Sequence, residues 1–168
     1  DITTNIPTSG GYYAAGQLYK NVTVDEAGHA VVGYKDKDGL VILKKVQVSS
    51  VATDLSGYSG WLCTYYMYDN LDQLRFVLSP KATNIIYSNG WNIAADMTTI
   101  SELCFRYEYD GRQRMIAKKV PGAGWTYMVY DLRDRLVFSQ DANMRSRGQW
   151  MSTLYDGENR PTATGMIT

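Results

Sequence analysis

The chain reads FRYEYDGRQRMIAKK from Phe105 to Lys119, and this one stretch contains every part of a β-hairpin. Aromatic and charged residues alternate up to Tyr109, so the aromatic side chains should share one face of a strand and the charges the other. Asp110 then opens a short polar turn, and apolar residues resume after Arg114. Two alternating runs joined by a short turn predict antiparallel strands.

The same plan occurs six times along the chain. Each copy has an aromatic or β-branched run, then Asp-x-x-Gly or a close substitute, then a second run. The copies are VDEAGH at Val24–His29, KDKDGL at Lys35–Leu40, YDNLDQ at Tyr68–Gln73, YDGRQR at Tyr109–Arg114, YDLRDR at Tyr130–Arg135 and YDGENR at Tyr155–Arg160. Repetition of one hairpin unit predicts a mainly β fold, in which antiparallel hairpin repeats form a curved, meandering sheet.

The spacing within each turn has a mechanical reason. A type I turn followed by a left-handed residue favours Asp at its first position, where the carboxylate accepts bonds from nearby backbone N–H groups. The fourth position needs a positive φ, which Gly adopts freely and Asn or Asp tolerates, so that only Gln113 strains the rule. The residues expected to build the turn motif are Asp25, Gly28, Asp36, Gly39, Tyr68, Asp69, Tyr109, Asp110, Tyr130, Asp131, Tyr155 and Asp156.

An arginine stands at the head of three returning strands, as Arg114, Arg135 and Arg160. One interpretation pairs each arginine across its hairpin with an acid. The other leaves it as a solvated turn charge that contributes little to stability. The sequence does not decide between them.

The order of the segments predicts a lead-in and one domain. Residues 1–16 form an extended lead-in, and 17–168 form a single β domain with an irregular insertion at about 80–104. Within the insertion, Ile93, Met97, Ile100 and Leu103 recur at three- and four-residue steps, which predicts a short amphipathic helix around 92–104. The chain begins and ends in mid-pattern, so we expect it to be part of a longer polypeptide.

Composition excludes several classes of protein. Lys plus Arg and Asp plus Glu number 17 each, so the chain lacks the basic field that a nucleic-acid binder needs. Cys63 and Cys104 lack metal-ligand spacing, and they are either unlinked core thiols or one disulfide bridge. The only histidine, His29, directly follows a turn, so no Ser/His/Asp or Cys/His system is expected. We expect no enzyme, no cofactor and no metal.

The Tyr-Asp hairpins resemble the YD repeats of RHS-type and teneurin-type proteins. The similarity is greatest from Glu102 to Gly165, and Tyr34–Gly39 and Pro121–Trp125 resemble the N-terminal part of long secreted bacterial RHS-type proteins. In such proteins many YD hairpins spiral into a hollow β shell that can enclose a C-terminal polypeptide, often a toxin. The resemblance implies a secreted or cell-surface structural segment whose partner is the rest of its own polypeptide. No residue of the family's self-cleaving core has a counterpart here.

Two other functions stay open. The first is a carbohydrate-binding or adhesive module, in which exposed tyrosines and Trp61, Trp91, Trp125 and Trp150 stack on sugar rings. Burial of these aromatic side chains in the core is the competing interpretation. The second is edge-to-edge self-association, since a sheet cut from a longer one leaves unpaired backbone groups at its edges.

Overall fold

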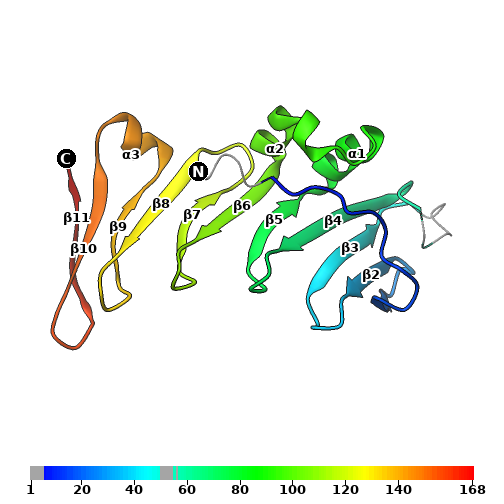
Figure 1. Cartoon of the computed structure of the whole chain (residues 1–168), viewed down its shortest axis with the longest axis horizontal. Helices are drawn as coiled ribbons and strands as arrows, with labels where there is room; N and C mark the ends of the chain where they lie inside the picture. Colours follow the sequence, from blue (N-terminus) through cyan, green and yellow to red (C-terminus); the bar gives the residue numbers. More distant parts are fainter. Residues whose placement is uncertain (1–5, 50–54, 56) are drawn as a thin grey trace. The chain divides into compact units, whose positions relative to one another are not determined.

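The computed structural model describes residues 6–49, 55 and 57–168, and the chain forms two compact units, Asp1–Phe105 and Arg106–Thr168. The mainly β prediction is confirmed: the described residues form eleven strands, and the strand pairings within each unit are antiparallel (Figure 1). Residues 6–16 of the expected lead-in form no strand or helix, and residues 1–5 lie outside the described residues.

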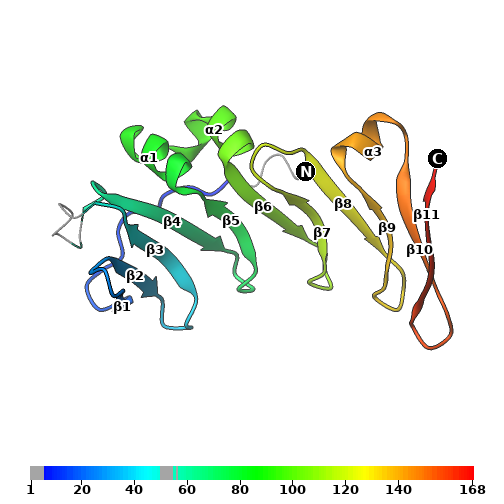
Figure 2. The ribbon, with the colours of Figure 1, turned by 180° about the vertical axis from the view of Figure 1, so that it is seen from behind.

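Unit 1 is a meander of five strands capped by helices. The strands are β1 (Tyr19–Val24), β2 (Ala30–Lys35), β3 (Val41–Gln47), β4 (Trp61–Tyr68) and β5 (Leu74–Leu78). Each pairs with the next, and β1 forms the edge, which is visible beside β2 in Figure 2. Consecutive turns of a meander lie at opposite ends of the sheet, so the 36–39 and 69–72 turns share one end.

Three helical segments follow β5: α1 (Pro80–Ser88), η1 (Ile93–Ala95) and α2 (Met97–Leu103). The short helix expected around 92–104 is present as α2. The longer α1 was not expected, because Thr, Asn and two adjacent isoleucines are weak helix formers. Its start is nevertheless well specified: Pro80 occupies the first turn, and the Ser79 side chain accepts a hydrogen bond from the Ala82 N–H.

Unit 1 has two apolar cores. One contains Phe76, Leu78, Ile86 and Cys104, and the helices close it over the sheet. The other contains Val32, Trp61 and Cys63. The two cysteines are therefore buried thiols in different clusters and are not joined by a disulfide, as in the interpretation that treats them as unlinked core thiols. Burial raises the pKa of the Cys63 thiol, and the nearby Lys45 partly offsets that shift.

Unit 2 repeats the hairpin plan. Its elements are β6 (Cys104–Tyr109), β7 (Met115–Lys119), β8 (Trp125–Tyr130), β9 (Leu136–Gln140), α3 (Ala142–Ser146), β10 (Trp150–Tyr155) and β11 (Pro161–Ile167). The short helix α3 follows β9, and the Asp141 side chain caps it by accepting a bond from the Met144 N–H. β11 pairs with β10 and is exposed along its whole length.

The strand β6 alternates as expected, but its charged face is the buried one. Arg106 and Glu108 are each 4 % exposed, whereas the tyrosines between and after them are half-buried. The Arg106 guanidinium has a ring partner on this face, since it lies 5.0 Å from the centre of the Trp125 ring. Lys119 of β7 is also buried, and it donates to the Ala123 carbonyl at 2.8 Å. Long basic side chains thus cover this buried face of β6 and β7. No helix in the described part of the chain is long and apolar enough to span a bilayer.

Candidate functional site

The six Asp turns share one hydrogen-bond pattern. In every turn the Oδ1 atom of the first Asp accepts from the backbone N–H groups two and four residues later, at 2.8–3.1 Å. The Asp N–H in turn donates to the carbonyl four residues on, which closes the hairpin. Such local bonds need no distant partner, and this is why sequence spacing alone can specify the turn.

The fourth position of each turn has a positive φ. Its residues and angles are Gly28 84°, Gly39 87°, Asp72 59°, Gln113 63°, Asp134 61° and Asn159 65°. Gln113 adopts the left-handed conformation despite its β-carbon, at a cost that the surrounding hydrogen bonds must offset.

Hydrogen bonds stabilise the ionised form of the carboxyl groups of Asp110, Asp131 and Asp156. Hydrogen bonding from Arg114 lowers the pKa of Asp110, and Arg135 does the same for the pKa of Asp131. The backbone N–H and the guanidinium of Arg160 lower the pKa of Asp156.

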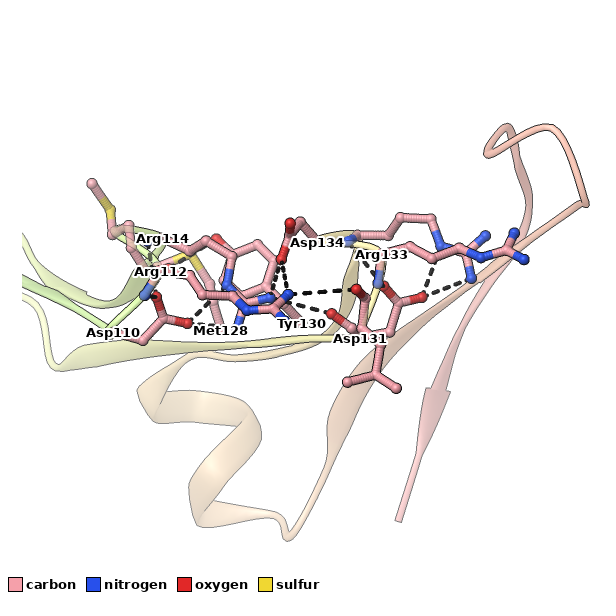
Figure 3. A network of polar contacts seen from close by, with 11 residues as sticks. Asp110, Arg112, Arg114, Met128, Tyr130, Asp131, Arg133 and Asp134 are labelled. Atoms are coloured by element: carbon pink, nitrogen blue, oxygen red, sulfur yellow. Dashed lines mark hydrogen bonds and ion pairs between the residues drawn. The ribbon is translucent and has the colours of Figure 1, made fainter.

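Arg114 links two neighbouring hairpins (Figure 3). Its Nε and Nη2 donate to Asp110 Oδ2 of its own turn at 2.8 and 2.6 Å. Its Nη1 reaches the following hairpin and donates to Asp134 Oδ1 at 2.6 Å and to the Asp131 carbonyl at 3.2 Å. The guanidinium carbon lies 4.9 Å from the centre of the Tyr130 ring. We call the set Arg114, Asp110, Tyr130 and Asp134 the Arg114 interlock.

The next junction repeats this arrangement as the Arg135 interlock, formed by Arg135, Asp131, Tyr155 and Asn159. Arg135 Nε binds Asp131 Oδ2 at 2.7 Å, and its Nη1 reaches Asn159 Oδ1 at 3.2 Å. Its guanidinium carbon also lies 4.9 Å from the centre of the Tyr155 ring. In both interlocks the tyrosine hydroxyl donates to a backbone carbonyl of the preceding hairpin. Tyr130 donates to the Met115 carbonyl at 2.8 Å, and Tyr155 donates to the Leu136 carbonyl at 2.9 Å.

For each arginine the sequence offered pairing with an acid across the hairpin as one of two interpretations, and the structure pairs each with the Asp of its own turn. The second partner was not indicated by the sequence. Contact with the next hairpin spans about twenty residues and depends on strand register. One sequence feature could have indicated the contact with the next hairpin. Successive turns carry Tyr, Asp and a left-handed residue at the same positions of the repeat.

Two of the four tryptophans, Trp61 and Trp91, lie in unit 1, and the other two, Trp125 and Trp150, lie in unit 2. Trp61 is 3 % exposed and lies in a core cluster, so it belongs to no outer surface. Trp91 is half-buried and packs edge-on against Tyr65 at 5.2 Å between ring centres. Trp125 stacks on Arg106, and Trp150 packs edge-on against Phe138 at 6.5 Å. Each ring thus has an intramolecular partner, and burial explains Trp61 fully.

Unit 1 contains an open groove of about 720 Å³. Six tyrosines contribute to its lining, among them the exposed Tyr12 of the lead-in and Tyr68 of β4. Asp36, Asp69 and Asp72 also line it, and among the described residues no Lys, Arg or His does. We call this feature the Tyr68 groove. Its volume lies within the range of ordinary ligand sites.

Comparisons with known proteins show the fold. No protein-family model and no curated protein matches the chain. The Photorhabdus luminescens Tc holotoxin pore, determined with a substituted TccC3, is 18% identical over 87% of this chain, with a TM-score of 0.60. The TcdB2-TccC3-Cdc42 and TcdB2-TccC3 crystal structures are also 18% identical, each over 84% of the chain, with TM-scores of 0.60 and 0.61. The chain spans 6% of the length of each of these proteins.

Proposed function

We propose that the chain is a non-catalytic wall segment of a YD-repeat shell in a secreted or cell-surface protein. The observation that carries this proposal is the interlock, in which an arginine of one hairpin is built into the turn of the next. The likeness in fold to Tc toxin structures supports it. The function is architectural: hairpins placed side by side form a wall, and the wall encloses a C-terminal toxin-like polypeptide of the same protein.

The exposure of the arginines supports the same proposal. The side chains of Arg114 and Arg135 are 23 % and 21 % exposed, because the following hairpin covers them. Arg160 binds Asp156 at 2.7 Å in the same way, but its side chain is 69 % exposed. The low exposure of Arg114 and Arg135 thus comes from the hairpin that follows each of them, as expected for hairpins packed side by side in a wall.

The test uses the coding sequence downstream of Thr168 and the longest polypeptide that it encodes. We expect further YD hairpins, a C-terminal segment that resists limited proteolysis, and faster cleavage of that segment when Arg114 and Arg135 are both replaced by Ala. A reading frame that passes directly into an unrelated surface module, or a C-terminal segment cleaved equally fast in both proteins, would overturn the proposal.

A carbohydrate-binding or adhesive module is the second candidate. The tyrosine lining of the Tyr68 groove favours it, because sugar rings stack on aromatic faces. Tryptophan fluorescence during titration with soluble polysaccharides tests it, since Trp91 also lines the groove. A saturable change would favour the module, and a flat response would favour the wall.

Self-association is proposed as a secondary property of the isolated chain. β11 pairs with β10 and is exposed throughout, so its outer edge can accept another strand. Light scattering at rising concentration tests this property, and a strictly monomeric species would count against it.

A further inference from the structure

The hairpin junction of unit 1 has the same backbone geometry as the two interlocks of unit 2. In all three junctions a tyrosine directly precedes the turn Asp, and its hydroxyl donates to a carbonyl of the preceding hairpin. Tyr68 donates to the Val41 carbonyl at 3.2 Å, as Tyr130 does to Met115 and Tyr155 to Leu136. Each accepting residue stands five positions after the Asp of its own turn. The three junctions can therefore be compared residue by residue.

The comparison identifies one missing cation. Arg114 and Arg135 stand four residues after their turn Asp, and Leu40 occupies that place after Asp36. Leu40 still lines the groove at this junction, but its side chain has no N–H group that could donate a hydrogen bond to the next turn. In the described part of the chain no hydrogen bond or ion pair reaches the carboxylate of Asp72, the counterpart of Asp134.

The Tyr68 groove lies at this junction. Leu40, Tyr68 and Asp72, which correspond to the members of the Arg114 interlock, all line it, together with Asp36 and Asp69. Asp69 has an arginine, Arg75, at 3.8 Å. The part of the lining that the structure describes contains three Asp and six Tyr residues but no basic residue. A site with this charge favours a cationic ligand.

We infer that the Tyr68 groove binds the arginine side chain of a polypeptide segment. A guanidinium is planar, stacks on tyrosine and offers several N–H donors, so that it can satisfy carboxylates from two different turns. Arg114 does so in unit 2, where it binds Asp110 and Asp134 while lying over Tyr130. Within the described chain no three carboxylates converge at metal-ligand spacing, so the groove suits an extended cation better than a metal ion. A volume of about 720 Å³ also has room for residues that flank the arginine.

The test is a nuclear magnetic resonance titration of the isotope-labelled chain with two short peptides. One peptide carries a single arginine, and the other carries citrulline, its neutral isostere, at the same position. We expect the arginine peptide to produce saturable shifts of the Leu40 and Asp72 amide signals. We expect the citrulline peptide to bind about tenfold more weakly or not at all, because charged hydrogen bonds are lost.

Three variants make the test specific. Asp72→Asn should weaken binding of the arginine peptide about tenfold. Asp38→Asn removes the same charge from a neighbouring turn residue that does not line the groove, and should leave binding unchanged. Leu40→Arg should supply the missing guanidinium within the chain and abolish binding. Amide signal dispersion shows whether each variant is folded, and Asp72→Asn decides the matter if Leu40→Arg does not fold.

Several results would overturn the inference. Equal shifts with the arginine and citrulline peptides would show that charge is not recognised. Equal losses in Asp72→Asn and Asp38→Asn would show a general electrostatic effect. Displacement of the peptide by a neutral oligosaccharide that binds more tightly would assign the groove to a sugar.

Discussion

Arg114 and Asp134 lie 2.6 Å apart, although they belong to two different hairpins of unit 2. The same guanidinium is anchored to Asp110 of its own turn. This side chain therefore links the shape of one turn to the position of the next, and Arg112 of the same turn also donates to Asp134 Oδ1, at 3.0 Å. The turn, usually the most mobile part of a hairpin, here holds the neighbouring hairpins together.

Replacement of Arg114 tests this linking role. Arg114→Gln should lower the free energy of unfolding by about 1–3 kcal/mol, because it removes charged hydrogen bonds to two turns. Arg160→Gln is the matched control, since Arg160 has the same own-turn bond but is 69 % exposed. Its loss should be below about 1 kcal/mol. Urea denaturation measures the free energy of unfolding of both variants. Equal losses would show that Arg114 does not link the two hairpins.

Stability should depend on the ionisation of the turn carboxylates. Arginine hydrogen bonds hold the pKa values of Asp110 and Asp131 below their ordinary value of 3.8, and backbone and guanidinium bonds do so for the pKa of Asp156. A carboxyl group with a lowered pKa in the folded state contributes its full stability above pH 3.8. That contribution is lost as the pH falls through the lower, folded-state value.

The measurement is the urea midpoint between pH 2 and pH 6. We expect a plateau at the upper end and a steady fall below about pH 4. Asp131→Asn keeps an oxygen for the turn N–H groups but cannot ionise, so its midpoint should fall less steeply. If the urea midpoint of Asp131→Asn falls with pH as steeply as that of the original chain, ionisation of Asp131 does not contribute to the pH dependence.

Gly124 should tolerate no side chain. A β-carbon at this position would lie 2.5 Å from the β-carbon of Ala142 in α3, well inside van der Waals contact. Gly124→Ala should therefore cost about 1–3 kcal/mol of unfolding free energy, through displacement of α3. Gly111→Ala is the control, because a β-carbon there meets nothing within 4 Å and its φ is not positive. Thermal denaturation compares them, and two neutral results would mean that α3 shifts without cost.

Gln113 should gain from replacement by glycine. Its φ of 63° is unfavourable for a residue with a β-carbon, and Gln113→Gly should stabilise the chain by about 0.5–1 kcal/mol. Asp72→Gly makes the same change at a φ of 59°, but Asp already tolerates this conformation. Its gain should be smaller. A destabilised Gln113→Gly protein would show that the glutamine side chain contributes more than its strain costs.

The turns were predictable because their physics is local. Asp131 binds N–H groups two and four residues later, so the spacing of the sequence contains the whole interaction. The buried face of β6 was not predictable in the same way. Alternation places Arg106 and Glu108 on one face of the strand but does not say which face is buried. The contact between Arg106 and Trp125, which belongs to another strand, depends on the packing of the sheet.

The helix α1 shows a second limit of sequence reasoning. Ile85 and Ile86 are β-branched and suggest a strand, but Ile86 is fully buried in the core of unit 1. Tertiary packing therefore outweighs local propensity here. The pair Ser79-Pro80 was the available signal, since a capping serine followed by proline marks the first turn of a helix.

Both interlocks point the same way along the chain: each arginine reaches the hairpin that follows it, at a separation of about twenty residues. The bond between each arginine and its own aspartate lies within one hairpin, so it can form before the following hairpin is synthesised. A hairpin formed in this way would offer the following segment a guanidinium that is already oriented. Assembly can proceed by vectorial addition during translation, with short loops closed at every step and no need for a late segment to return to an early one.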